Sequence, residues 1–133
     1  MAQVIQLHEV PSLREKVSEE EWALRVELAA VYRLVARFGW DDGIFTHSSV
    51  RLPGRDHHFL INPYGHLFSE VCASNLVKID VDGNVLDDSP YEVIKAGFVI
   101  HSAIHMSRGD AMCVIHTHTN AGMAVSAQKD GLL

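Results

Sequence analysis

Residues 18–39 carry the strongest folding signal in this 133-residue sequence. Ser18, followed three residues later by Glu21, is a capping box that starts a helix, and Gly39 stands where a C-terminal cap belongs. Between them, apolar residues recur at spacings of four and three, the pattern of one buried helix face. That face consists of Leu24, Leu28, Val31, Val35 and Phe38. We therefore expect one long helix packed on a core, preceded by an N-terminal arm over residues 1–17.

Short strand and turn signals follow this helix. Strands are expected at residues 46–52, 58–62, 76–81 and 111–116. Turns are expected at residues 53–56 and 82–84. Further helical segments are expected at residues 67–75, 94–107 and 120–128. Strands joined by hairpins and mixed with helices predict a layered α/β or α+β fold with substantial antiparallel pairing.

Charge and composition argue against several classes of function. A formal net charge of -6 opposes non-specific binding to nucleic acid or to an anionic membrane, and we expect neither partner. No apolar stretch approaches the length of a membrane span, and the N-terminus lacks the pattern of an export signal. Cys72 and Cys113 lie in apolar sequence, so we expect two buried, reduced thiols and a cytoplasmic location.

The nine histidines are the residues of this sequence best suited to metal binding or acid–base chemistry. His116 and His118 stand two apart at the end of a predicted strand, so their side chains point to the same face and can bind one divalent ion such as zinc. A catalytic zinc site needs about three protein ligands, so a third must come from elsewhere. His101 and His105 lie one helical turn apart, a spacing that also suits a metal. For that second pair we favour packed, hydrogen-bonded histidines near the site.

Other nucleophile and histidine patterns are weaker. Ser48, Ser49 and Ser102 lack the flanking glycines of a nucleophile elbow, which disfavours a serine hydrolase. His57 and His58 follow a predicted turn, and we expect them to be solvated.

Six segments, read in order, resemble class II aldolase/adducin domains, and the likeness is closest to the adducin-like branch. The segments are residues 46–51, 59–65, 73–80, 96–105, 114–119 and 124–133. The resemblance covers about residues 20–133 and is specific in combination. It implies a layered α/β/α fold with a largely antiparallel central sheet over residues 18–133, incomplete at its C-terminus.

The resemblance also implies a metal and a substrate class. Enzymes of this family hold zinc with three histidines and act as lyases or epimerases on small hydroxy-carbonyl, sugar-like compounds. His116 and His118 match the first two ligands, and the third falls beyond the last residue of this sequence. Tyr64 and Gly65 match the family loop near the substrate phosphate, and His47 is a further candidate for substrate binding.

One departure bears on catalysis. The position of the family's proton-transferring glutamate falls on Gly97, and two phosphate-binding serines are replaced by Lys95 and Ala96. Three readings therefore stay open: a zinc-dependent lyase or epimerase, a non-catalytic adducin-like binding or assembly module, and a fragment without independent function. Family members commonly form homo-tetramers, so we also expect self-association.

Overall fold

The computed structural model describes residues 12–54 and 57–130. The helices of this part are α1 (Glu19–Phe38), α2 (Lys95–Ser107) and α3 (Asn120–Ser126), with short 3-10 turns η1 (Gly43–Phe45) and η2 (Phe68–Glu70). The strands are β1 (His47–Arg51), β2 (Phe59–Ile61), β3 (Val77–Ile79) and β4 (Cys113–His116). Each predicted strand is found, one or two residues shorter at each end in most cases. Pairing ends where the flanking turns bend the chain.

Helix α1 begins and ends where its local signals place it. The Ser18 side chain accepts the Glu21 amide N–H at 3.1 Å, and Gly39 adopts the left-handed conformation with φ 64°. The Glu21 carboxylate does not return to the cap, because it pairs with Arg25 and Lys78. The prediction that Phe38 is buried was wrong, since it is 57% exposed and stacks on Trp40, just past the end of the helix.

The four strands form one antiparallel sheet in the order β3-β2-β1-β4. Strand β1 lies inside the sheet, with Ser49 opposite Ile61 of β2 and His47 opposite His116 of β4. The turn predicted at residues 82–84 is confirmed by a bridge from Ile79 to Val85. Since β1 and β4 are neighbours, segments about seventy residues apart meet at one sheet edge.

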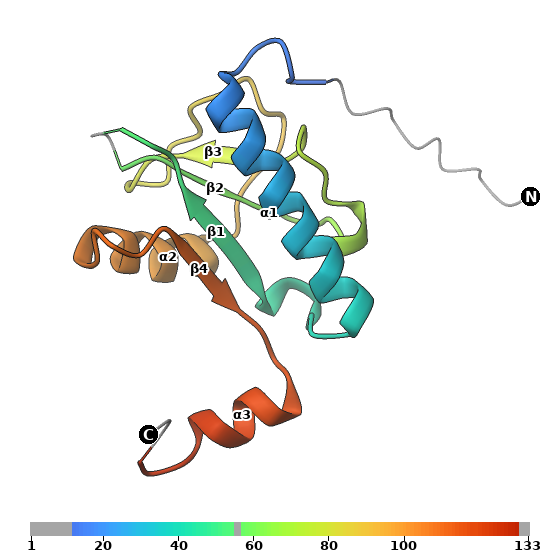
Figure 1. The fold of residues 1–133 in the computed structure, drawn as a ribbon, viewed down its shortest axis with the longest axis vertical. Helices are drawn as coiled ribbons and strands as arrows, with labels where there is room; N and C mark the ends of the chain where they lie inside the picture. Colours follow the sequence, from blue (N-terminus) through green and yellow to red (C-terminus); the bar gives the residue numbers. More distant parts are fainter. Residues whose placement is uncertain (1–11, 55–56, 131–133) are drawn as a thin grey trace, which may run out of the picture.

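Helices cover both faces of the sheet, as Figure 1 shows, with α1 on one side and α2 on the other. Leu60 points into the core under α1 and packs with Tyr32, while its neighbours Phe59 and Ile61 pack on the opposite side with Phe98 of α2. This alternation is the period of two of a β-strand buried on both faces. The predicted α/β/α layering is confirmed.

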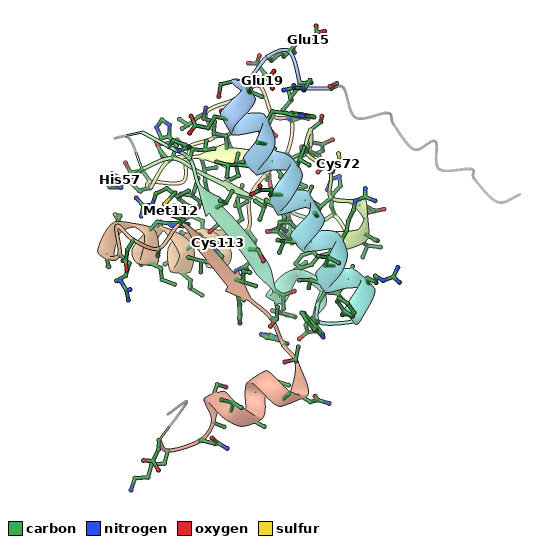
Figure 2. All side chains as sticks on the ribbon, viewed as in Figure 1. Glu15, Glu19, His57, Cys72, Met112 and Cys113 are labelled. Carbon is green, nitrogen blue, oxygen red and sulfur yellow. The ribbon has the colours of Figure 1, made fainter. Side chains whose placement is uncertain are left out.

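The C-terminal elements are more exposed than the rest. Strand β4 is at the sheet edge, and α3 projects away from the layered body without a buried residue (Figure 1). The prediction of two buried thiols was wrong: Cys113 is exposed on β4 and Cys72 is half-buried after η2 (Figure 2). An apolar neighbourhood in sequence does not bury a residue on an edge strand. Among the described residues, no helix combines the length and apolar character needed to cross a bilayer.

Candidate metal centre

The histidine pair at the end of β4 converges on one point. His116 is the last residue of the strand, and the chain after it is held by the His118 amide N–H, which donates to the Trp40 carbonyl at 3.3 Å. The Nε2 atoms of His116 and His118 lie 3.1 Å apart. The predicted pair is therefore brought together by the strand end itself.

This spacing fits a divalent ion. Two imidazole nitrogens 3.1 Å apart could both reach one zinc ion, because a Zn–N bond is about 2.0–2.1 Å long. The Nδ1 of His118 lies 2.8 Å from the Asp42 carboxylate, so its Nε2 is the nitrogen that faces His116. Such carboxylate–histidine pairs orient metal ligands in zinc sites. Within residues 12–54 and 57–130, no third carboxylate, thiol or imidazole completes the set.

His47 brings a third imidazole next to the pair, without joining it as a ligand. It lies on β1 directly opposite His116, is 3% exposed, and its ring centroid is 4.9 Å from that of His116. Its Nδ1 is 2.7 Å from the Nε2 of His101. Burial, followed by the neighbouring His116 and His118, lowers the pKa of His47 to about 4. His47 is therefore a neutral imidazole at neutral pH.

Gly97, where the resemblance places a glutamate, lies directly against the ring of His47. A Cβ atom at Gly97 would lie 2.9 Å from Cδ2 of His47 and 3.1 Å from Cγ2 of Ile94. Real Cβ atoms do not approach other atoms so closely, so the absence of a side chain at this position admits the His47 ring. The ring thus occupies space that any residue other than glycine would need.

A row of polar side chains links β1 to α2 behind His47. His47, Ser49 and Arg51 alternate along β1 and so face α2 together. The Ser49 hydroxyl lies 2.5 Å from Nδ1 of His101 and 2.8 Å from Nε2 of His105. The guanidinium of Arg51 donates to the backbone carbonyl of His105.

The two helical histidines are packed and hydrogen-bonded, as expected. His101 is 0% exposed and His105 is 1% exposed. Burial, together with the neighbouring His47, lowers the pKa of His101 to about 3. Burial also lowers the pKa of His105, against a bond to the Ala111 carbonyl that raises it. Both are neutral at physiological pH, which suits a hydrogen-bonding role rather than a charged one.

The remaining predicted site residues lie elsewhere. Tyr64 and Gly65 are exposed in the loop after β2, where Tyr64 donates its amide N–H to Glu92. In the described part of the chain, no hydrogen bond joins either residue to His47, His116 or His118. His57 is exposed and His58 half-buried, and the Nδ1 of His57 lies 2.8 Å from the Arg51 guanidinium.

Two residues of the cluster were missed from the sequence. Asp42 is 76 residues from its partner His118. The sequence indicates Ser49 only as a possible nucleophile, because its partner His101 is 52 residues away. A period-two reading of His47, Ser49 and Arg51 would have placed them on one face of the strand. Only the pairing of β1 with β4 and its packing against α2 reveal the partners.

Comparisons with known proteins bear on this arrangement. The family model described as "Class II Aldolase and Adducin N-terminal domain" matches residues 26–133. A Caulobacter vibrioides protein provisionally named as an aldolase class 2 protein is 62% identical over 122 residues, covering 92% of this chain and 48% of the relative. Rattus norvegicus alpha-adducin is 50% identical over 115 residues, covering 85% of this chain and 16% of the relative.

Solved structures show the same likeness. An aldolase II superfamily protein from Pseudomonas syringae matches with TM-score 0.84 and 57% identity, covering 92% of this chain and 50% of that one. L-fuculose 1-phosphate aldolase from Glaciozyma antarctica PI12 matches with TM-score 0.73 and 35% identity, covering 82% of this chain and 45% of that one. The chain thus spans about half the length of the two solved structures and of the Caulobacter relative.

Proposed function

The chain belongs to the class II aldolase and adducin family, and from this we propose that it supplies two ligands of a divalent-metal site for a small hydroxy-carbonyl compound. The ligands are His116 and His118, and zinc is a metal that suits imidazole ligands. The reaction class is that of a lyase or epimerase. This agrees with the name of a similar solved structure, an L-fuculose 1-phosphate aldolase.

One observation carries the proposal: two Nε2 atoms converge at 3.1 Å, and a carboxylate holds the outer nitrogen of one ring. When bound, a divalent metal would act as a Lewis acid toward a carbonyl oxygen of the substrate. The residues of the chain then have separate tasks. Asp42 orients His118, and His47 lies beside the pair, where it can contact substrate. Tyr64 and Gly65 remain candidates for substrate binding by resemblance.

Turnover measured with the metal removed and then restored tests this proposal. Purified protein, freed of metal by chelator and then reloaded with zinc, is assayed for cleavage and epimerisation of a panel of small hydroxy-ketones and their phosphates. The proposal predicts turnover that the chelator abolishes, that zinc restores, and that His116→Ala removes. A matched control is His66→Ala, because His66 contacts Tyr91 rather than the cluster. Turnover that survives both the chelator and His116→Ala would contradict the metal role.

A second candidate function is a non-catalytic adducin-like binding or assembly module. Gly97 favours it, because the residue expected to transfer a proton has no side chain and its space is taken by His47. The 50% identity to alpha-adducin is in line with this alternative. In the same assay, a protein that binds zinc through His116 but turns over none of the panel would support the module over the enzyme.

Self-association is also part of the proposal, by resemblance to the family. We expect a homo-oligomer, and a tetramer in particular. Multi-angle light scattering of the purified chain tests this, and a monodisperse monomer at micromolar concentration would count against it. The cytoplasmic location stays a prediction.

A further inference from the structure

The polar row between β1 and α2 is buried too deeply to be incidental. Ser49 and His101 are 0% exposed, and His105 is 1% exposed. Polar groups in such surroundings are nearly always hydrogen-bonded, because an unpaired one costs about 1–3 kcal/mol. Three contacts join them in a chain that ends at His47, the member that lies next to His116. The direction of these bonds decides which atom His47 presents to the site.

A backbone carbonyl fixes that direction at the inner end. The Nδ1 of His105 lies 3.2 Å from the carbonyl oxygen of Ala111, which can only accept, so Nδ1 carries the hydrogen. A neutral His105 then has a bare Nε2, which accepts the Ser49 hydroxyl at 2.8 Å. Since the single hydroxyl hydrogen of Ser49 is used there, its oxygen must accept from Nδ1 of His101 at 2.5 Å.

The direction of the bond between His101 and His47 follows from the same constraint. A neutral His101 with its hydrogen on Nδ1 has a bare Nε2, which accepts from Nδ1 of His47 at 2.7 Å. The depressed pKa values of His101 and His105 agree with this neutral state. All four bonds therefore run in one direction, from His47 toward the Ala111 carbonyl. His47 is left with its hydrogen on Nδ1 and a lone pair on Nε2.

We propose that Ser49, His101 and His105 form a buried positioning relay that holds His47 in its Nδ1–H tautomer, so that Nε2 accepts a hydrogen bond from a hydroxyl group of the substrate. This inference rests on the proposed function for its ligand, a hydroxy-carbonyl compound, and deepens it by assigning the hydroxyl to His47. A carbonyl oxygen carries no hydrogen, and a phosphate monoester near neutral pH is mostly the dianion because its second pKa is about 6, so neither is a good match for a lone pair. The relay thus selects for a hydroxyl.

The surroundings leave Nε2 available. Within an imidazole ring, Nε2 lies across from Nδ1, so it points away from His101 and the relay. Cδ2, which is bonded to Nε2, faces Gly97, where no side chain intervenes. No hydrogen bond within residues 12–54 and 57–130 occupies this nitrogen, and the ring lies against His116. A substrate held at the histidine pair would therefore meet the free edge of His47.

Nitrogen NMR of the imidazole rings tests the relay directly. The full 133-residue chain, labelled with 15N-histidine and kept in chelator at neutral pH, is examined by long-range proton–nitrogen correlation. His47, His101 and His105 should all show a protonated Nδ1 and a bare Nε2. An Nε2–H tautomer at His47 would overturn the proposal. Because neither metal nor substrate is needed, this outcome is distinguishable from failure of the metal-site proposal.

Variants separate the relay from a merely structural role. Ser49→Ala removes the hydroxyl that links His101 to His105, so His47 should populate both tautomers. Ser102→Ala is the matched control, because Ser102 is also buried and its hydroxyl donates to the Val99 carbonyl in its own helix. His47 should keep its Nδ1–H tautomer in the control. A His47 that stays fully Nδ1–H in Ser49→Ala would contradict the relay, and the wild-type spectrum stands as the test if that variant does not fold.

Two small ketones, one with hydroxyl groups and one without, test whether His47 binds a hydroxyl group. Dihydroxyacetone, which carries hydroxyl groups, should move the Nε2 resonance of His47, whereas acetone, which has none, should not. If Ser49→Ala leaves about half of the molecules in the competent tautomer, its dissociation constant for dihydroxyacetone should rise about twofold. Equal shifts with both probes, or none with dihydroxyacetone, would overturn the assignment of the hydroxyl to His47.

Discussion

Lowering the pH from about 7.5 to about 5 should destabilise the protein, and His101 alone should account for about 2 kcal/mol of the loss. His101 is fully buried, and burial lowers its pKa from 6.5 to about 3. The unfolded chain therefore binds a proton as the pH falls through 6.5, while the folded protein does not. This group therefore does not lower the stability above pH 6.5, and it lowers the stability progressively as the pH falls below that value.

The magnitude follows from proton linkage. At about pH 7.5 the histidine is mostly neutral in both states and contributes little. At about pH 5 it is charged in the unfolded chain and neutral in the folded one, and a pKa unit is worth about 1.4 kcal/mol, which gives about 2 kcal/mol. The lowered pKa values of His47 and His105 act in the same direction, so the total loss should be larger.

Urea unfolding at both pH values measures the effect, with chelator present to exclude bound metal. His101→Gln keeps a polar side chain that does not titrate, so its loss between the two pH values should be smaller than that of the wild type by about 2 kcal/mol. Ser102→Ala should behave as the wild type, because it removes no titratable group. Equal losses in wild type and His101→Gln would refute the reasoning.

Three further predictions rest on single contacts. Gly97→Ala should lower the free energy of unfolding by about 1 kcal/mol or more in urea, because the new Cβ meets the fixed ring of His47; unchanged or higher stability would contradict this. Arg25→Met should cost about 3–5 kcal/mol, because it leaves Asp87 without its buried partner, whereas Arg108→Met in an exposed pair should change nothing measurable. Asp42→Asn should weaken zinc binding about tenfold in calorimetry, since the carboxylate holds His118; equal affinity would argue against that role.

Much of the fold was predictable because its signals are local. The caps of α1, the strands and the turn at residues 82–84 depend on neighbouring residues only, and the structure contains them. Burial was less predictable, since it depends on where an element ends. Phe38 is the last residue of α1 and Cys113 lies on an edge strand, so neither is buried despite its apolar sequence context.

Some residues of the candidate site were likewise predictable from local sequence, and others were not. His116 and His118 were predictable as a pair because two residues on a strand end share a face. Asp42 and Ser49 were not, because their partners lie 76 and 52 residues away and meet them only through the packing of β1 with β4 and α2. The reason for glycine at position 97 likewise required the position of the His47 ring.

Zinc binding by the purified chain tests the central claim most directly. Isothermal titration of metal-free protein should show one zinc ion bound per chain, or per shared site in an oligomer. His116→Ala should abolish this binding, and the control His66→Ala should leave it intact. No zinc bound by the wild type, or binding that persists unchanged in His116→Ala, would contradict a metal site at the end of β4.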